Sequence, residues 1–200
     1  MDISKLSSGP NPPWDVHVLV EIPQGSTEPV KYDFDQASGA MTVERFLHTA
    51  MFCPANYGFI PHALARAGDS LDALVVSGSG VVPGSVIRSR PIGALVLRDE
   101  HGEYEKIIAV PVDALHPYYP RANSCSDLPE TLRDQIAHFF QHYKDLEKGK
   151  WATVSEWLGP DAAARLVAEA IERSKPLRGK KKQRPSSADV SPPPGAGDTA

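Results

Sequence analysis

Nine side chains of the kinds that bind phosphate groups and divalent cations lie between residues 21 and 106. They are Glu21, Lys31, Asp33, Arg45, Tyr57, Asp69, Asp72, Asp99 and Lys106. Carboxylate oxygens suit Mg²⁺, and Lys, Arg and Tyr donate hydrogen bonds to phosphate oxygens. The set therefore indicates metal-assisted chemistry on a phosphate compound. By residue type alone, a solvated face of charged side chains is the more common explanation of such a set.

The elements that must position these side chains are short strands. Asp15 to Ile22 is rich in β-branched residues, and Val30 to Phe34 alternates apolar and polar residues, which puts Lys31 and Asp33 on one face. Further strands are expected at 39–46, 81–97 and 106–112. Many short strands at this spacing predict a closed barrel or a sandwich.

Helices are expected in the last third of the chain. Asp127 to Glu130 resembles a capping box, apolar residues follow at helical spacing from Leu132 to Leu146, and Gly149 is expected to end this helix. A second helix is expected from Asp161 to Ser174.

Composition narrows the class of protein. The 200 residues, of which 41% are hydrophobic, suffice for one domain, and the net charge of −4 argues against a general nucleic-acid or membrane-surface binder. Cys53 and Cys125 are expected to be free thiols, since they form no paired motif. The N-terminus does not resemble a secretory signal, and no apolar run approaches the roughly 20 residues of a membrane span, so a cytoplasmic protein is expected.

Three parts of the chain are expected. Residues 1–13 are interpreted as a flexible N-terminal arm, 14–175 as the folded domain, and 176–200 as a disordered tail rich in basic residues and proline. The tail has almost nothing to bury, and its short basic run is interpreted as solvated.

Seven groups of residues carry a family resemblance. They are Glu21-Ile22-Pro23; Lys31-Tyr32-Asp33; Arg45-Phe46; residues 51–61 (MFCPANYGFIP); residues 68–72 (GDSLD); residues 83–88 (PGSVIR); and residues 136–147 (IAHFFQHYKDLE). In order and spacing they resemble the soluble family I inorganic pyrophosphatases of the bacterial, hexameric branch, over about residues 14 to 175.

The resemblance implies a fold and an activity. The implied fold is mainly β (α+β), a five-stranded OB-like closed barrel with two flanking helices. The implied enzyme is an inorganic diphosphatase, which hydrolyses pyrophosphate to two phosphates by metal-activated water. Its metal would be Mg²⁺, with Mn²⁺ as an alternative, and its assembly a homohexamer. No nucleic acid or membrane is expected as a partner.

The resemblance also assigns roles to residues. Asp69 matches the carboxylate that helps to activate water, and Glu21, Asp72 and Asp99 match metal ligands. The positions that bind the phosphate groups are matched by Lys31, Arg45, Tyr57, Lys106, Tyr143 and Lys144. Because Tyr143 and Lys144 cannot both face inward on an ideal helix, the end of that helix is expected to depart from ideal geometry.

The chain departs from the family at its metal ligands. Ala67 and Tyr104 stand where the family has aspartates that hold one high-affinity metal together with Asp72. Alanine offers no oxygen and a neutral tyrosine is a poor Mg²⁺ ligand, so weakened metal binding is expected. Glu103 or Glu105 could replace the missing carboxylate only if a loop re-aimed it, since strand alternation puts both opposite Tyr104.

Three hypotheses follow from these features. The first is an active pyrophosphatase with weakened metal affinity. The second is a catalytically silent paralogue that binds phosphate or pyrophosphate, or that hetero-oligomerises. The third is an OB-barrel nucleic-acid binder, which the acidic net charge and the lack of a surface aromatic series disfavour.

Overall fold

The computed structural model of the protein describes residues 2–26, 30–35, 38–115 and 122–178. Over these residues the chain forms strands β1 (Val16–Ile22), β2 (Val30–Phe34), β3 (Met41–Phe46), β4 (Asn56–Leu64), β5 (Ser70–Val75), β6 (Val86–Asp99), β7 (Gly102–Pro111) and β8 (Ala152–Leu158). It also forms two α-helices, α1 (Glu130–His142) and α2 (Pro160–Arg178), and two 3-10 turns, η1 (Ile3–Lys5) and η2 (Cys125–Asp127).

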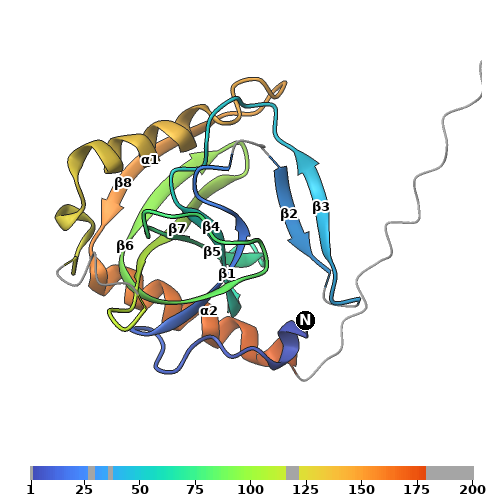
Figure 1. Cartoon of the computed structure of the whole chain (residues 1–200), viewed down its shortest axis with the longest axis vertical. Coiled ribbons are helices and arrows are strands. Elements are labelled where there is room, and N and C mark those ends of the chain that lie inside the picture. Colours follow the sequence, from blue (N-terminus) through green and yellow to red (C-terminus); the bar gives the residue numbers. More distant parts are fainter. Residues whose placement is uncertain (1, 27–29, 36–37, 116–121, 179–200) are drawn as a thin grey trace, which may run out of the picture.

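Five strands form a closed ring, and this barrel lies at the centre of the molecule (Figure 1). The order around the ring is β1-β4-β5-β7-β6, and antiparallel pairing of β6 with β1 closes it. Strand β8 pairs with the outer edge of β6 and continues the sheet beyond the ring. The prediction of a mainly β, five-stranded closed barrel with two helices is confirmed.

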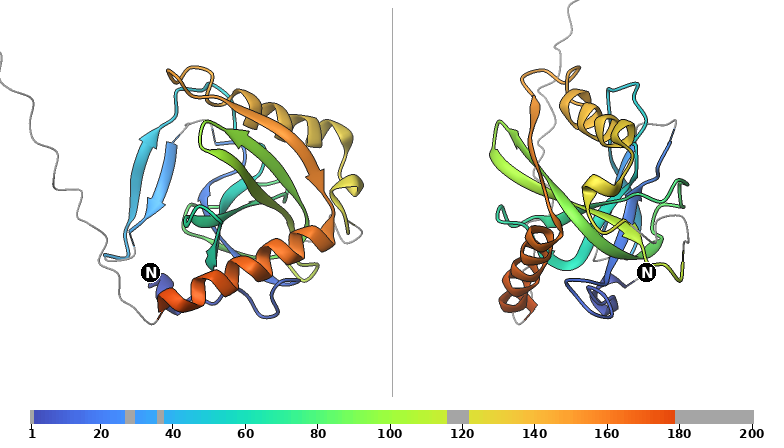
Figure 2. Two further views of the ribbon diagram at one scale, coloured as in Figure 1. Left: turned by 180° about the vertical axis from the view of Figure 1, so that it is seen from behind. Right: turned by 90° about the vertical axis from the view of Figure 1, so that its left-hand side faces the viewer.

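The two helices cover different parts of the barrel (Figure 2). On one side Val16, Val18 and Val20 of β1 pack with Val167 and Ala170 of α2. On the other side Ile136, Phe139 and Phe140 of α1 pack against apolar residues of β6 and β7. Strand alternation explains why β1 can supply apolar side chains to one core and Glu21 to the opposite face.

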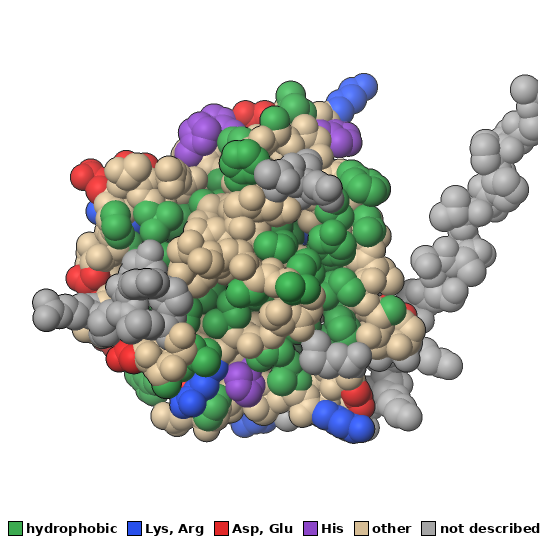
Figure 3. All heavy atoms as spheres, viewed as in Figure 1, with side chains coloured by type: hydrophobic (Ala, Val, Ile, Leu, Met, Phe, Trp, Pro, Cys, Tyr) green, Lys and Arg blue, Asp and Glu red, His purple; other side chains and the backbone are tan. Residues whose placement is uncertain are grey.

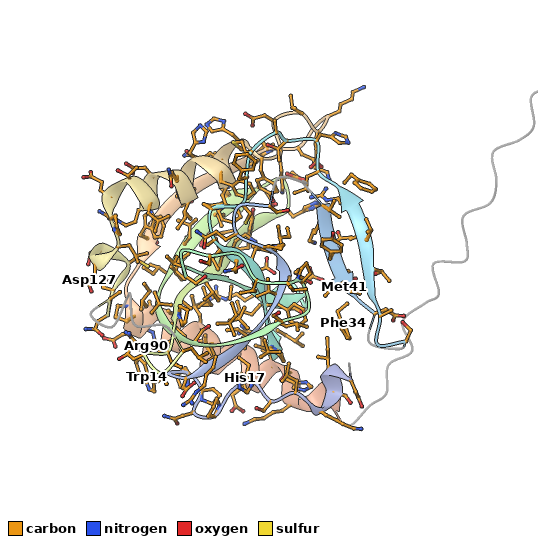
Figure 4. All side chains as sticks on the ribbon, in the orientation of Figure 1. Trp14, His17, Phe34, Met41, Arg90 and Asp127 are labelled. Atoms are coloured by element: carbon orange, nitrogen blue, oxygen red, sulfur yellow. The ribbon has the colours of Figure 1, made fainter. Side chains whose placement is uncertain are left out.

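Strands β2 and β3 form a separate hairpin beside the barrel (Figure 1). Phe34 and Met41 lie on the side of the hairpin that faces the barrel (Figure 4) and pack with Leu19 and Phe59. Ile3 of η1 belongs to the same cluster and is only 4% exposed. The hairpin is therefore fixed to the barrel by a small apolar contact of its own.

The ends of the domain differ from the expected boundaries. The segment before β1 contains the turn η1 and buries Ile3, where a flexible arm was expected. Helix α2 continues to Arg178, past its expected end at Ser174, because no proline or glycine interrupts it before Pro176 and that residue is accommodated within it. The remainder of the expected tail, residues 179–200, lies outside the described residues.

Two details of α1 were predicted wrongly. The capping box expected at Asp127 to Glu130 does not form, and α1 begins after Pro129 without a side-chain cap. A different capping box, made by the Ser124 hydroxyl and the Asp127 carboxylate, caps η2. The helix ends at His142 rather than near Gly149, so that Leu146 lies outside it and is exposed. Apolar spacing alone did not locate this end, because the following turns contain further apolar residues.

None of the helices in the described part of the chain is both long enough and apolar enough to cross a membrane.

Candidate active site

A buried lysine, a tyrosine and a carboxylate from three neighbouring strands meet at the centre of the site. The Lys106 ammonium of β7 donates to Asp72 Oδ2 of β5 at 2.5 Å and to the Tyr57 hydroxyl of β4 at 3.1 Å. The Tyr57 hydroxyl donates to the same Asp72 oxygen at 2.5 Å. The pairing order β4-β5-β7 explains why residues so far apart in the sequence converge here.

Aromatic rings enclose this ammonium. Lys106 Nζ lies 4.9 Å from the ring centroid of Tyr57, 5.2 Å from that of Tyr104 and 5.4 Å from that of Phe140. The Lys106 side chain is 5% exposed, whereas the Asp72 side chain is 30% exposed. Cation–π attraction and one ion pair together stabilise a charge that would otherwise be costly to bury.

Glu21 is a buried carboxyl beside other acidic groups. It is 7% exposed at the end of β1. Burial and the nearby charge of Asp72 raise its pKa to about 8, although Lys31 opposes the shift. A cation placed between Glu21 and Asp72 would remove the repulsion that raises this pKa.

The β2–β3 hairpin delivers two cations to the same cleft. Lys31 pairs with Arg45 across the strands, and an irregularity follows at once, leaving Glu44 without a strand partner. This bulge brings the Glu44 carboxylate to 2.6 Å from Lys31 Nζ. Burial lowers the pKa of Lys31, but Glu44 and the more distant Glu21 and Asp72 outweigh it and raise the pKa overall.

Arg45 connects the hairpin to the segment that follows α1. Its guanidinium donates to Glu147 Oε2 at 2.8 Å, and Lys150 reaches the same oxygen at 2.8 Å. Burial would raise the pKa of Glu147, but its hydrogen bond with Lys150 and the charge of Arg45 lower it overall. One cavity of about 70 Å³ is lined by Ile22, Lys31, Arg45, Leu47, Cys53, Tyr57, Phe139, Phe140 and Tyr143.

The end of α1 resolves the expected conflict between Tyr143 and Lys144. The helix ends at His142, so both residues lie in the turn that follows it. Tyr143 lines the cavity and stacks on Phe139 with 5.4 Å between ring centroids. Lys144 is 8% exposed and donates to Asp99 Oδ2 at 2.8 Å. Although burial opposes it, this hydrogen bond lowers the pKa of Asp99.

Asp69 lies apart from these contacts. It is exposed in the turn before β5, where its carbonyl oxygen accepts a hydrogen bond from the Ala65 amide at 2.8 Å. No side-chain partner of Asp69 is recorded among the described residues. Ala67 is exposed in the same turn. The structure thus brings together Glu21, Asp72 and the cations, while Asp99 is paired with Lys144 and Asp69 stands at the edge.

The carboxylates of the site fit a cation between Glu21 and Asp72 better than a cation near Tyr104. Glu21 and Asp72 are near enough for the charge of one to raise the pKa of the other, so a hard cation shared by them is electrostatically favourable. Near Tyr104, Asp72 and Asp99 offer carboxylates, but Asp72 Oδ2 is already bound by Lys106 and Tyr57, and Asp99 Oδ2 by Lys144. No group of three or more His, Cys, Asp or Glu with metal-binding geometry occurs within the described ranges.

Sequence reasoning assigned no role to three residues that shape the site. Glu44 and Glu147 hold Lys31 and Arg45, and Phe140 covers Lys106. Glu147 stands at the end of the motif 136–147 and could have been considered as a partner for a cation. Glu44 gave no such signal, because a bulge cannot be recognised from strand alternation.

Comparison with known proteins agrees with this geometry. Residues 18–175 match the family model for inorganic pyrophosphatase. An inorganic pyrophosphatase of Caulobacter vibrioides is 60% identical over 173 residues, which are 86% of this chain and 97% of that protein.

Solved structures give the same result. An inorganic phosphatase from Anaplasma phagocytophilum superposes with a TM-score of 0.82 at 46% identity, covering 86% of this chain and 99% of that one. The inorganic pyrophosphatase from Thermus thermophilus superposes with a TM-score of 0.81 at 38% identity, covering 88% and 99% of the two chains.

Proposed function

Because this chain belongs to the inorganic pyrophosphatase family and is therefore an inorganic diphosphatase, we propose that it hydrolyses pyrophosphate in the cleft between the β2–β3 hairpin, the barrel and α1. The observation that carries this assignment is the convergence of Tyr57, Asp72 and Lys106 beside the cavity that Lys31 and Arg45 line.

The cationic and phenolic side chains bind the phosphate groups in this proposal. Lys31 and Arg45 line the cavity from the hairpin, Tyr57 from the barrel floor and Tyr143 from the end of α1. Lys106 contacts Tyr57, and Lys144 follows Tyr143 in the chain. Pyrophosphate is a compact polyanion, so donors from three sides neutralise its charge and stabilise the further charge that develops on the leaving phosphate. Burial and the charge of Asp72 raise the pKa of Tyr57, which keeps its hydroxyl protonated as a donor.

The carboxylates have a second role. Glu21 and Asp72 would hold Mg²⁺, with Mn²⁺ as an alternative, and Asp99 is proposed as a ligand that must first release Lys144. When bound, the metal supplies positive charge and a water of lowered pKa. Asp69, exposed in the turn before β5, is proposed to orient the attacking water or to accept its proton.

Weakened metal binding is part of the proposal. Ala67 and Tyr104 remove two carboxylates that the family resemblance places around one metal. Fewer anionic ligands lower the affinity of a site for a hard cation. The enzyme should therefore reach full activity only at higher Mg²⁺ concentration than a relative with both aspartates.

Self-association into a homohexamer and a cytoplasmic location are also proposed, from the family alone. The face seen in Figure 3 is compatible with covering by another subunit. Its centre is mostly hydrophobic or uncharged, and most of its charged side chains lie near the rim. Sedimentation velocity on the purified chain tests the assembly.

A phosphate-release assay tests the activity. We expect pyrophosphate hydrolysis that saturates with Mg²⁺, and loss of nearly all activity in Asp72→Asn, which keeps the shape but removes the charge. Asp134→Asn, on the exposed face of α1, is the matched control and should behave as the wild type. Absence of phosphate release at every Mg²⁺ and Mn²⁺ concentration would instead support the silent phosphate-binding paralogue.

A further inference from the structure

A second cavity, of about 560 Å³, lies between the segment before β1 and helix α2 (Figure 2). This N-terminal cavity is lined by residues 4–9, Pro12, His62 of β4, and Ala168, Ile171 and Glu172 of α2. These residues are different from those that line the cavity of the candidate active site. Its volume falls within the range of about 300 to 1,000 Å³ that is usual for small-molecule sites.

The backbone is strained at the wall of the N-terminal cavity. His62 has a φ of 56°, in the left-handed region, and it is the one residue other than glycine with a positive φ in the described part of the chain. Its carbonyl oxygen accepts a hydrogen bond of 2.6 Å from the Ser174 hydroxyl, which ties the strained residue to α2. Strained residues gather at ligand sites, where the surrounding structure maintains them at a cost to stability.

The polar groups of the N-terminal cavity suit an anion. Lys5 pairs with Asp2 at 3.4 Å, but their side chains are 82% and 50% exposed, so the pair is weak and Lys5 can turn to a ligand. Glu172 is bound by Lys175, which balances its charge. Within the described ranges no acceptor is recorded for the backbone amides of residues 7–9, and consecutive amides are suitable donors to an anionic group.

The remaining wall is apolar. Pro12 and Ala168 line the cavity together with Leu6 and Ile171, which are half-buried. A ligand with an apolar group would remove this surface from water, and that burial favours binding. The lining therefore matches a molecule that joins a charged group to an apolar one.

The segment before β1 connects the N-terminal cavity with the β2–β3 hairpin. Lys5 lines the cavity, and two residues earlier Ile3 is buried in one cluster with Phe34 and Met41 of the hairpin. A ligand that holds residues 4–9 in place also holds Ile3 against the hairpin. Binding in this cavity should therefore stabilise the element that presents Lys31 and Arg45.

We propose that the N-terminal cavity binds a small organic anion and that the bound anion stabilises the β2–β3 hairpin. The charged group of the ligand contacts Lys5 and the amides of residues 7–9, and its apolar part packs against Leu6 and Ile171. This binding is independent of the proposed function, whereas its effect on the KM for pyrophosphate rests on that function.

Binding of 4-fluorophenylacetate to the purified full chain tests the cavity. This probe joins a carboxylate to an apolar ring, and its fluorine NMR signal should broaden saturably. Ala168→Trp fills the cavity from an exposed position of α2 and should weaken binding by about tenfold. The matched control is Arg165→Trp, which adds the same ring at an exposed position of α2 outside the lining and should bind as the wild type does.

A second variant removes charge instead of space. Lys5→Met changes a side chain that is 82% exposed and should weaken binding of the probe by about fivefold, because a charged hydrogen bond is lost. Equal affinities in the wild type, Ala168→Trp and Lys5→Met, or equal weakening by the two tryptophan substitutions, would overturn the site.

Hydrogen exchange tests the connection to the hairpin without turnover. Saturating probe should slow exchange within 30–34 and 41–46 by about fivefold, at the low end of usual coupling between sites, and leave β6 unchanged. The KM for pyrophosphate should fall by the same factor. Unchanged exchange in the hairpin with probe bound would overturn the coupling. Absence of hydrolysis, together with probe binding and slower exchange, would overturn the proposed function alone.

Discussion

At the scale of single residues, the site is a set of charges that depend on one another. Glu21 is buried next to Asp72, and each additional negative charge makes the ionised form of Glu21 less favourable. Lys106 reduces this effect at Asp72 by direct contact. The protonation of Glu21 therefore reports whether a cation is present between the two carboxyls.

The pH dependence of stability tests the state of Glu21 in metal-free protein. Its pKa is about 8 in the fold and 4.5 as the ordinary value. Between these values the folded state holds a proton that the unfolded state has lost, so stability falls as pH rises across the window and then levels off. Glu21→Gln lacks this loss, and its free energy of unfolding should exceed that of the wild type by on the order of 5 kcal/mol at the upper end. Urea unfolding in the presence of a chelator measures the difference.

The control for this prediction is Glu103→Gln, which changes an exposed carboxyl of β7. It should follow the wild-type pH profile. A free energy of unfolding for the wild type that does not change across the window would contradict the assignment of a raised pKa to Glu21.

The sequence predicted the kinds of residue in the site better than their contacts. Residue types and the family motif identified Lys31, Arg45, Tyr57 and Tyr143, which line one cavity. The anionic partners of the cations were not predicted, because the contacts occur at irregular positions of the backbone. Glu44 pairs with Lys31 beside a bulge, and Lys144 pairs with Asp99 from the turn after α1 ends at His142.

At the scale of secondary-structure elements, the β2–β3 hairpin determines how Lys31 and Arg45 are presented. Among the residues that the structure describes it makes no strand pairing with the barrel, and its apolar contact consists mainly of Phe34 and Met41 against Leu19 and Phe59. An element attached by so small a cluster should open more easily than the barrel strands.

Truncation of Phe34 should therefore loosen the hairpin. Phe34→Ala is expected to lower the free energy of unfolding by about 3 kcal/mol, the usual cost of emptying a buried aromatic position. Hydrogen exchange should quicken within 30–34 and 41–46 more than in β6 and β7. Val43→Ala in the same hairpin is the control, since Val43 is 50% exposed and should change stability little. Uniform quickening across all strands would show that the hairpin does not open separately.

Element prediction succeeded where one face is clearly apolar. The expected strand at 30–34 matches β2, and the expected helix from Asp161 lies within α2. Strands β4 and β5 were not expected, although most of their residues are buried. Strand β8 was also missed, because Ala152–Leu158 is mostly half-buried or exposed and lies at the edge of the sheet. Such a strand carries little of the alternation by which strands are recognised.

At the scale of the whole molecule, closure of the barrel holds the three central residues together. Strand β4 carries Tyr57 and lies between β1 and β5, which carries Asp72. The contact between β1 and β4 is unusually close at Gly58, where an added Cβ would lie 1.9 Å from the Leu19 carbonyl oxygen. Only glycine allows the two backbones to approach in this way.

Gly58→Ala should consequently disrupt the barrel as a unit. We expect destabilisation of about 3 kcal/mol, with loss of activity, because backbone rather than a mobile side chain obstructs the new methyl group. Gly159→Ala is the matched control, since an added Cβ there meets nothing within 4 Å. Thermal unfolding of both variants measures the contrast, and equal melting temperatures would refute the close approach at Gly58.

Each of the four cations from the strands and the end of α1 already has an anionic partner. Lys31 is bound to Glu44, Arg45 to Glu147, Lys106 to Asp72 and Lys144 to Asp99. An anion that enters the cleft must therefore compete with these carboxylates of the protein for the four cations. Chloride, with a single charge, gains too little from one contact to compete, whereas a polyanion that engages several cations at once can do so. The ion pairs that these cations form in the absence of substrate would then favour binding of a polyanion over the abundant simple anions of the cell.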